Sequence, residues 1–147
     1  MERTFFITSV TWGRRAVFQN DQRARLLLDV LYHYRPRYLL HEFVIMPDHI
    51  HLIITPGMTL SLERAVQLIK GGFSFRAGRK LEIWQPSFTN HRIRDVEDYA
   101  RYRTYIHNNP VKRGMVVNAE EFAYSSANKA FVLDSMPPGL KPSSFAA

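Results

Sequence analysis

Two histidines separated by one residue, His49 and His51, and a later tyrosine, Tyr105, are the side chains in this sequence best suited to chemistry. Side chains alternate across a strand, so both imidazoles point to one face, with their Cα atoms roughly 6.5–7 Å apart. Tyr105 lies in a helical pattern with Asn109 one turn later, so the phenol and the amide share a face. A divalent metal held beside a positioned tyrosine predicts attack on a phosphodiester.

Two histidines need a third protein ligand before they form a catalytic metal site. Asn109 is our candidate, because an amide oxygen is a hard donor suited to Mg²⁺ or Mn²⁺. Asn108 is an alternative at the same helix end. His41 beside His49 would instead give a three-histidine zinc site. We rank that site lower because it leaves Tyr105 without a role.

Other residues of the same types have simpler interpretations. Tyr99, Tyr102 and Ile106 follow a spacing of three and four, which is typical of a buried helical stripe. We therefore assign both of these tyrosines to packing. His91 and His107 are expected at the surface or facing DNA.

The charge of the chain favours a phosphate-bearing partner. Its 147 residues carry a net charge of +7, and 15 of the 20 basic residues are arginine, whose planar fork matches phosphate oxygens. The absence of cysteine excludes disulfides and thiolate sites and fits a reducing cytoplasm, where a DNA-binding protein would associate with the nucleoid. No apolar run is long enough for a membrane span. The residues predicted to contact DNA are Arg64, Lys70, Arg76, Arg79, Lys80, Arg92, Arg94, Lys112 and Arg113.

The hydrophobic pattern predicts the elements that must position these residues. Strands are expected over residues 4–11, 38–46, 49–55 and 83–93. A first helix is expected over residues 23–34, with a cap at Asn20. A second helix should begin after a cap at Thr59 or Ser61, and Gly71 and Gly72 should weaken its far end. A third is expected over residues 95–108, where Pro110 ends it. This order predicts an α+β ferredoxin-like sandwich with an antiparallel sheet. We expect the helices on one face, leaving the histidine face open to a ligand.

The length indicates one domain, over residues 1–133. Residues 134–147 contain three prolines and small polar residues and are expected to form a flexible tail. Residues 114–117 are predicted to form a short edge strand, which could pair two copies of the chain as a homodimer.

Several motifs together resemble a known family. Residues 44–54, VIMPDHIHLII, resemble the HUH motif of single-tyrosine transposases. Residues 105–114, YIHNNPVKRG, resemble the tyrosine helix of the subgroup called REP-associated tyrosine transposases. Residues 84–85, 91–94 and 124–126 also match that subgroup. The resemblance extends over about residues 4–128.

The resemblance implies a ferredoxin-like HUH nuclease core, a 5′-phosphotyrosine intermediate and single-stranded DNA substrates near hairpins. By motif position, His49 and His51 would bind the metal, Tyr105 would attack the phosphate and Asn109 would complete the site. The family often has asparagine before the first motif histidine, where this chain has Asp48. That residue either tunes the metal or shapes the turn.

We compare three functions. The first is a metal-dependent DNA strand transferase that cleaves and rejoins single strands. The second is a non-catalytic single-stranded nucleic-acid-binding module, in which basic and aromatic side chains serve phosphate contact and stacking. The third is a metal phosphodiesterase for small nucleotides, which ranks last because the positive charge exceeds what so small a substrate needs.

Overall fold

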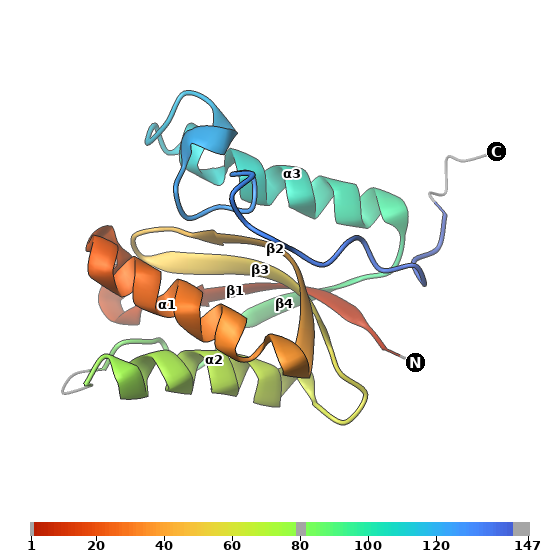
Figure 1. Cartoon of the computed structure of the whole chain (residues 1–147), viewed down its shortest axis with the longest axis horizontal. Helices are drawn as coiled ribbons and strands as arrows, with labels where there is room; N and C mark the ends of the chain where they lie inside the picture. Colours follow the sequence, from red (N-terminus) through yellow and green to blue (C-terminus); the bar gives the residue numbers. More distant parts are fainter. Residues whose placement is uncertain (1, 79–81, 143–147) are drawn as a thin grey trace.

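The computed structural model describes residues 2–78 and 82–142 as an antiparallel sheet between layers of helix (Figure 1). The strands are β1 (Thr4–Val10), β2 (Tyr38–Ile45), β3 (His49–Pro56) and β4 (Thr89–Ile93), in the sheet order β2-β3-β1-β4. The helices are α1 (Asp21–His33), α2 (Leu62–Arg76) and α3 (Val96–Lys112). Single 3₁₀ turns span Trp12–Arg14, Val17–Gln19, Arg35–Arg37 and Ala119–Glu121. The ferredoxin-like prediction is confirmed.

The two sheet faces carry separate apolar cores. Ile50, Leu52 and Ile54 of β3 pack with α1 and α2 on one face. Phe6 and Ile53 pack with α3 on the other. The prediction that all helices cover one face is therefore wrong: α3 lies on the sheet face opposite α1 and α2 (Figure 1), and its residues Tyr105 and Asn109 contact the two histidines. The reason is that this face is also apolar and must be buried against something.

Side-chain caps start the helices as predicted. Asn20 accepts a hydrogen bond from the backbone N–H of Arg23 at α1, and Ser61, not Thr59, accepts one from Arg64 at α2. Gly71 and Gly72 do not end α2, which continues to Arg76. The backbone of Gly72 instead packs closely against α1, where a Cβ would lie 2.9 Å from a ring carbon of Tyr34.

Two predicted boundaries and one predicted strand are wrong. The fourth strand is shorter than predicted, because the chain before β4 leaves the sheet around Pro86 and Trp84 only bridges to Thr11. Helix α3 continues through the buried Pro110 to Lys112, because packing against the rest of the fold outweighs the one backbone hydrogen bond that proline removes. Residues 114–117 form a turn, so the predicted edge strand is absent among the described residues.

The chain after α3 returns along the outer edge of β2 (Figure 1). The backbone of residues 124–126 bonds to Phe43 and Ile45. Farther on, Asp134 bonds to Leu40, and Lys141 bonds to the chain around Arg94. These contacts cover an exposed sheet edge, and residues 134–142 lie against the domain. No helix within residues 2–78 and 82–142 is long and apolar enough to cross a membrane.

Candidate active site

The pleat of β3 brings the two histidines together under α3. The ring centroids of His49 and His51 are 4.7 Å apart, and both side chains are buried. The intervening Ile50 faces the opposite core. Strand alternation, with β3 between β1 and β2, therefore fixes both rings on the α3 face.

His51 has the environment of a neutral ligand. Its Nδ1 lies 2.8 Å from the hydroxyl of Thr8, its register partner on β1. Its Nε2 is buried and has no hydrogen-bond partner among the described residues. Burial, and then the nearby charge of His49, lower the pKa of His51 to about 3, so the ring is uncharged near neutral pH. When Nδ1 donates its proton to Thr8, Nε2 keeps a free lone pair.

His49 is oriented by a carboxylate. Its Nδ1–H donates to Asp48 at 2.7 Å, so in the singly protonated ring the lone pair lies on Nε2. That Nε2 lies 3.1 Å from the amide oxygen of Asn109. Two electron-rich atoms at this distance need a proton or a cation between them. The arrangement fits a pair of metal ligands in which a carboxylate behind one imidazole fixes the orientation of the ring and makes it a better donor.

Asp48 is held by two arginines. Its carboxylate lies 2.9 Å from Arg14 and 3.7 Å from Arg113. Burial alone would raise the pKa of Asp48, but the hydrogen bonds from His49 and Arg14, with the nearby charges, hold it below its usual range. The carboxylate is therefore ionised near neutral pH. Arg14 reaches it from a left-handed backbone conformation, with φ of +53°.

Helix α3 delivers the tyrosine. The Tyr105 ring centroid is 5.2 Å from that of His51 and 5.9 Å from that of Phe6, whose ring it meets edge to face. Tyr105 is 45% exposed, whereas Asn109, one turn later, is buried. Because Pro110 does not end the helix, Asn109 keeps the helical geometry that places its amide beside His49. Asn108 is exposed and is not the third partner.

One basic cavity of about 470 Å³ unites these groups. It is lined by Thr8, Arg14, His49, His51, Tyr105, Asn109, Lys112 and Arg113. The structure thus brings together the four residues that the sequence predicted for chemistry. Thr8 and Arg14 were missed, since only strand pairing and the turn after β1 bring them to the cavity.

The alternative site built on His41 does not form. The Nδ1–H of His41 donates to the carbonyl of Ser135 at 2.8 Å, and its Nε2 lies 2.8 Å from the Thr55 hydroxyl. Burial lowers the pKa of His41. His107 was expected at the surface or facing DNA, and the structure places it only partly exposed, beside β2. It donates to the buried carboxylate of Glu42 at 2.6 Å. His91 lies at the surface and pairs with Asp98.

The predicted DNA contacts are divided between the two sides of the sheet. Lys112 and Arg113 line the cavity. Lys70 lies on α2, across the sheet, where its ammonium donates to the carbonyls of Gln85 and Ser87. The other predicted cations are Arg64 and Arg76 on α2, Arg92 on β4, Arg94 just beyond it, and Arg79 and Lys80, which lie outside the described residues. Their roles remain predictions.

The donor set fits a small divalent cation with a preference for nitrogen and hard oxygen ligands. Two Nε2 lone pairs, one of them otherwise unpartnered, and the Asn109 oxygen line the same cavity. No three His, Cys, Asp or Glu side chains cluster as a metal site within residues 2–78 and 82–142. The amide of Asn109 is thus the third donor that this arrangement offers.

Comparison with known proteins identifies the family. A family model described as "Transposase IS200 like" matches residues 4–109, a range that includes both histidines, Tyr105 and Asn109. The chain belongs to the IS200-like transposase family. The REP-associated tyrosine transposase of Escherichia coli K12 is 30% identical over 136 residues, covering 86% of this chain and 82% of that protein. A Haemophilus influenzae relative is 34% identical over 99 residues, covering 58% and 56%.

A solved structure extends this family match to three dimensions. It is described as the REP-associated tyrosine transposase bound to a REP hairpin. It has a TM-score of 0.70 and 30% identity, covering 92% of this chain and 86% of that chain. Transposases process DNA, so the family places the cavity in a DNA-binding, DNA-processing enzyme.

Proposed function

We propose that this transposase cleaves and rejoins single-stranded DNA through a 5′-phosphotyrosine formed on Tyr105. The observation that carries the proposal is the cavity itself. An exposed phenol, two imidazoles and an amide oxygen meet there among basic side chains, in a member of a DNA-processing family. A simple binding module does not need two buried histidines with lone pairs directed into one cavity.

Two transfers account for cleavage and rejoining. Tyr105 Oη, after losing its proton, attacks the scissile phosphorus, the bond from phosphorus to the 3′ oxygen breaks, and that oxygen takes up a proton. A 3′ hydroxyl then attacks the phosphotyrosine, and the phenol leaves and is reprotonated. Each step exchanges one phosphate ester for another, so no external energy source is required.

His49, His51 and Asn109 would hold the divalent cation, Mg²⁺ or Mn²⁺. When bound, it would supply Lewis-acid stabilisation of charge on the phosphate. The neutral state of His51 and the carboxylate behind His49 prepare both rings for this role before the metal arrives.

The DNA would enter across the cations at the cavity. Arg14, Lys112 and Arg113 line the same cavity as Tyr105, and Asp48 pairs with two of them, Arg14 and Arg113. The solved relative bound to a REP hairpin supports hairpin DNA as the partner class. A cytoplasmic, nucleoid-associated location belongs to the same proposal. A homodimer also remains a prediction, although the edge strand expected to form it is absent from the described residues.

The direct test is covalent capture of DNA. Labelled single-stranded hairpin DNA is incubated with the protein and Mn²⁺, and a protease-sensitive, slowly migrating band is sought on a denaturing gel. Tyr105→Phe should abolish the band while the hairpin dissociation constant stays within about twofold, because the ring remains and only the nucleophile is removed. Tyr102→Phe is the matched control, since the Tyr102 ring stacks on Phe6.

Two results would contradict the proposal. An adduct that persists in Tyr105→Phe and vanishes in Tyr102→Phe would move the nucleophile to the neighbouring turn. Tight hairpin binding by the wild-type protein with no adduct would favour the non-catalytic nucleic-acid-binding module.

A further inference from the structure

An irregularity in β2 directs a carboxylate toward the helix that carries Tyr105. The pairing of β2 with β3 shifts register between Leu40 and Glu42, which leaves His41 as an extra residue. Leu40 and Phe43 consequently face the same core, although they are three residues apart. Strict alternation from Leu40 would have pointed Glu42 into that apolar core. The bulge points it toward α3 instead, which is a known use of such bulges.

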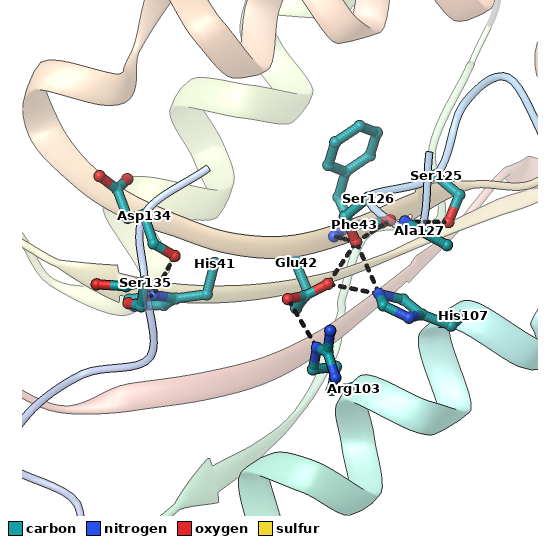
Figure 2. Close-up of polar contacts among 10 residues, drawn as sticks. All are labelled: His41, Glu42, Phe43, Arg103, His107, Ser125, Ser126, Ala127, Asp134 and Ser135. Carbon is teal, nitrogen blue, oxygen red and sulfur yellow. Dashed lines mark hydrogen bonds and ion pairs between the residues drawn. The ribbon is translucent and has the colours of Figure 1, made fainter. Parts of the chain in front are cut away.

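Glu42 is buried but fully partnered (Figure 2). Its carboxylate accepts from His107 at 2.6 Å and from Ser126 at 2.7 Å, and it pairs with Arg103 at 3.3 Å. Burying a carboxylate costs several kcal/mol unless such partners offset it. The cluster therefore connects three segments: β2, α3 and the chain around Ser126.

The Ser126 contact gives a role to the residue 124–126 motif. The Ser126 hydroxyl accepts a hydrogen bond from the backbone N–H of Phe43 at 3.0 Å. The backbone N–H of Ser126 donates to the Phe43 carbonyl. The motif thus pairs with the β2 edge and presents its hydroxyl to Glu42 (Figure 2). Residues 124–126 do not line the cavity that contains Tyr105.

The two flanks of α3 have different tasks. At 100° per residue, Tyr105 lies about 160° around the helix from both Arg103 and His107. Ile106, fully buried, lies between these flanks and rests on the sheet. One flank therefore meets the histidine pair and the other meets Glu42. A helix resting on a narrow apolar ridge can roll about its axis, and a fixed contact on the far flank prevents this.

The effect of a roll is large compared with catalytic tolerances. A rotation of about 10° moves a group about 6 Å from the helix axis by about 1 Å. A displacement of that size at a reacting group can lower a rate about 100-fold.

We propose that Glu42 is a positioning residue, which fixes the rotation of α3 so that Tyr105 and Asn109 face His49 and His51. This inference rests on the proposed function only for its kinetic consequence. The geometric part, that the Glu42 cluster sets the orientation of Tyr105, stands without catalysis.

The kinetic test compares two variants with the same change in charge. Glu42→Gln keeps the shape of the side chain but removes the charge that pairs with Arg103 and His107. Glu63→Gln makes the same change on the exposed surface of α2, across the sheet. At saturating hairpin DNA, the single-turnover rate of adduct formation should fall 10- to 100-fold in Glu42→Gln and stay within about twofold in Glu63→Gln. Hairpin affinity should be the same in both.

The second readout is spectroscopic and requires no activity. Tyrosines are replaced by 3-fluorotyrosine, and the ¹⁹F signal of Tyr105 is assigned with Tyr105→Phe. In Glu42→Gln this signal should shift or broaden, while that of Tyr38, on the opposite face, should not. His107→Ala should have the same effects, and the double variant should lose no more rate than the more impaired single variant, because both act through one contact.

A destabilised control separates positioning from general loss of stability. Val30→Ala removes methyl groups from the α1 core and lowers the melting temperature without touching this cluster. At a temperature where all variants are folded, Val30→Ala should keep both the wild-type rate of adduct formation and the wild-type ¹⁹F signal of Tyr105. The proposal would be overturned if Glu42→Gln and His107→Ala kept the wild-type rate of adduct formation and the wild-type Tyr105 signal. It would also be overturned if Val30→Ala lost as much rate as Glu42→Gln. If wild-type protein gives no adduct, the proposed function fails while the ¹⁹F comparison still decides the positioning role.

Discussion

Replacing Asp48 should lower metal affinity without lowering DNA affinity. Its carboxylate accepts the Nδ1 proton of His49 and pairs with Arg14 and Arg113. In Asp48→Ala, His49 loses the acceptor that fixes its ring orientation and proton position. Loss of such a partner typically costs 10- to 100-fold in metal affinity, or about 1.4–2.8 kcal/mol.

The same substitution frees two arginines at the DNA entrance. Both guanidinium groups are about half exposed, and exposed ion pairs contribute only about 0–1 kcal/mol. The fold should therefore lose little stability. Hairpin affinity should stay equal or rise by at most about fivefold.

Asp48→Asn is the matched control. The amide oxygen can still accept from His49, so the ring orientation is kept and only the charge is lost. Its loss of metal affinity should be smaller than that of Asp48→Ala, below about tenfold. A result in which both variants lose equally would assign the effect to charge alone.

The assay measures the two ligands separately. Free Mn²⁺ is titrated by electron paramagnetic resonance, and hairpin binding is followed by fluorescence anisotropy in EDTA. The reasoning is refuted if Asp48→Ala binds Mn²⁺ within about twofold of wild type. A parallel fall in hairpin affinity would also refute it, because the freed arginines could then not be contacting phosphate.

Two further predictions test the core and the DNA surface. Gly72→Ala should destabilise the fold by about 1–3 kcal/mol in urea unfolding, because the new Cβ would lie 2.9 Å from Tyr34. Gly71→Ala is the control: its Cβ would have nothing within 4 Å, so it should be neutral or stabilising by up to about 1 kcal/mol. Equal effects of the two substitutions would show that helix propensity decides both. Arg113→Gln should reduce the log–log salt slope of hairpin binding by about one, while Lys70→Gln, across the sheet, should not. An equal reduction in Lys70→Gln would instead support the α2 contacts predicted from the sequence.

The local chemistry of the site could be predicted from the sequence. His49 and His51 share a face because strand side chains alternate, and Tyr105 and Asn109 share a face because helix residues one turn apart do. The order of elements similarly predicted the ferredoxin-like sheet. These are properties of short segments, and short-range periodicity is what a sequence displays directly.

Other features depend on partners distant in the sequence. The bulge at His41 is a property of two paired strands, so the alternation of β2 alone could not reveal that Glu42 faces α3. The contact of His107 was missed for the same reason, since its partner Glu42 lies on another element. Pro110 stays helical because its burial in the fold outweighs its local preference.

The sequence by itself therefore determined which groups could act and on which local face each one lies. The tertiary structure decided that α3 covers the histidine face, that Arg14 reaches Asp48 and that Glu42 holds the far flank of the tyrosine helix. The physical reason is that helix and strand periods act within one segment. Burial of a second apolar face and compensation of a buried charge are settled only when distant segments meet.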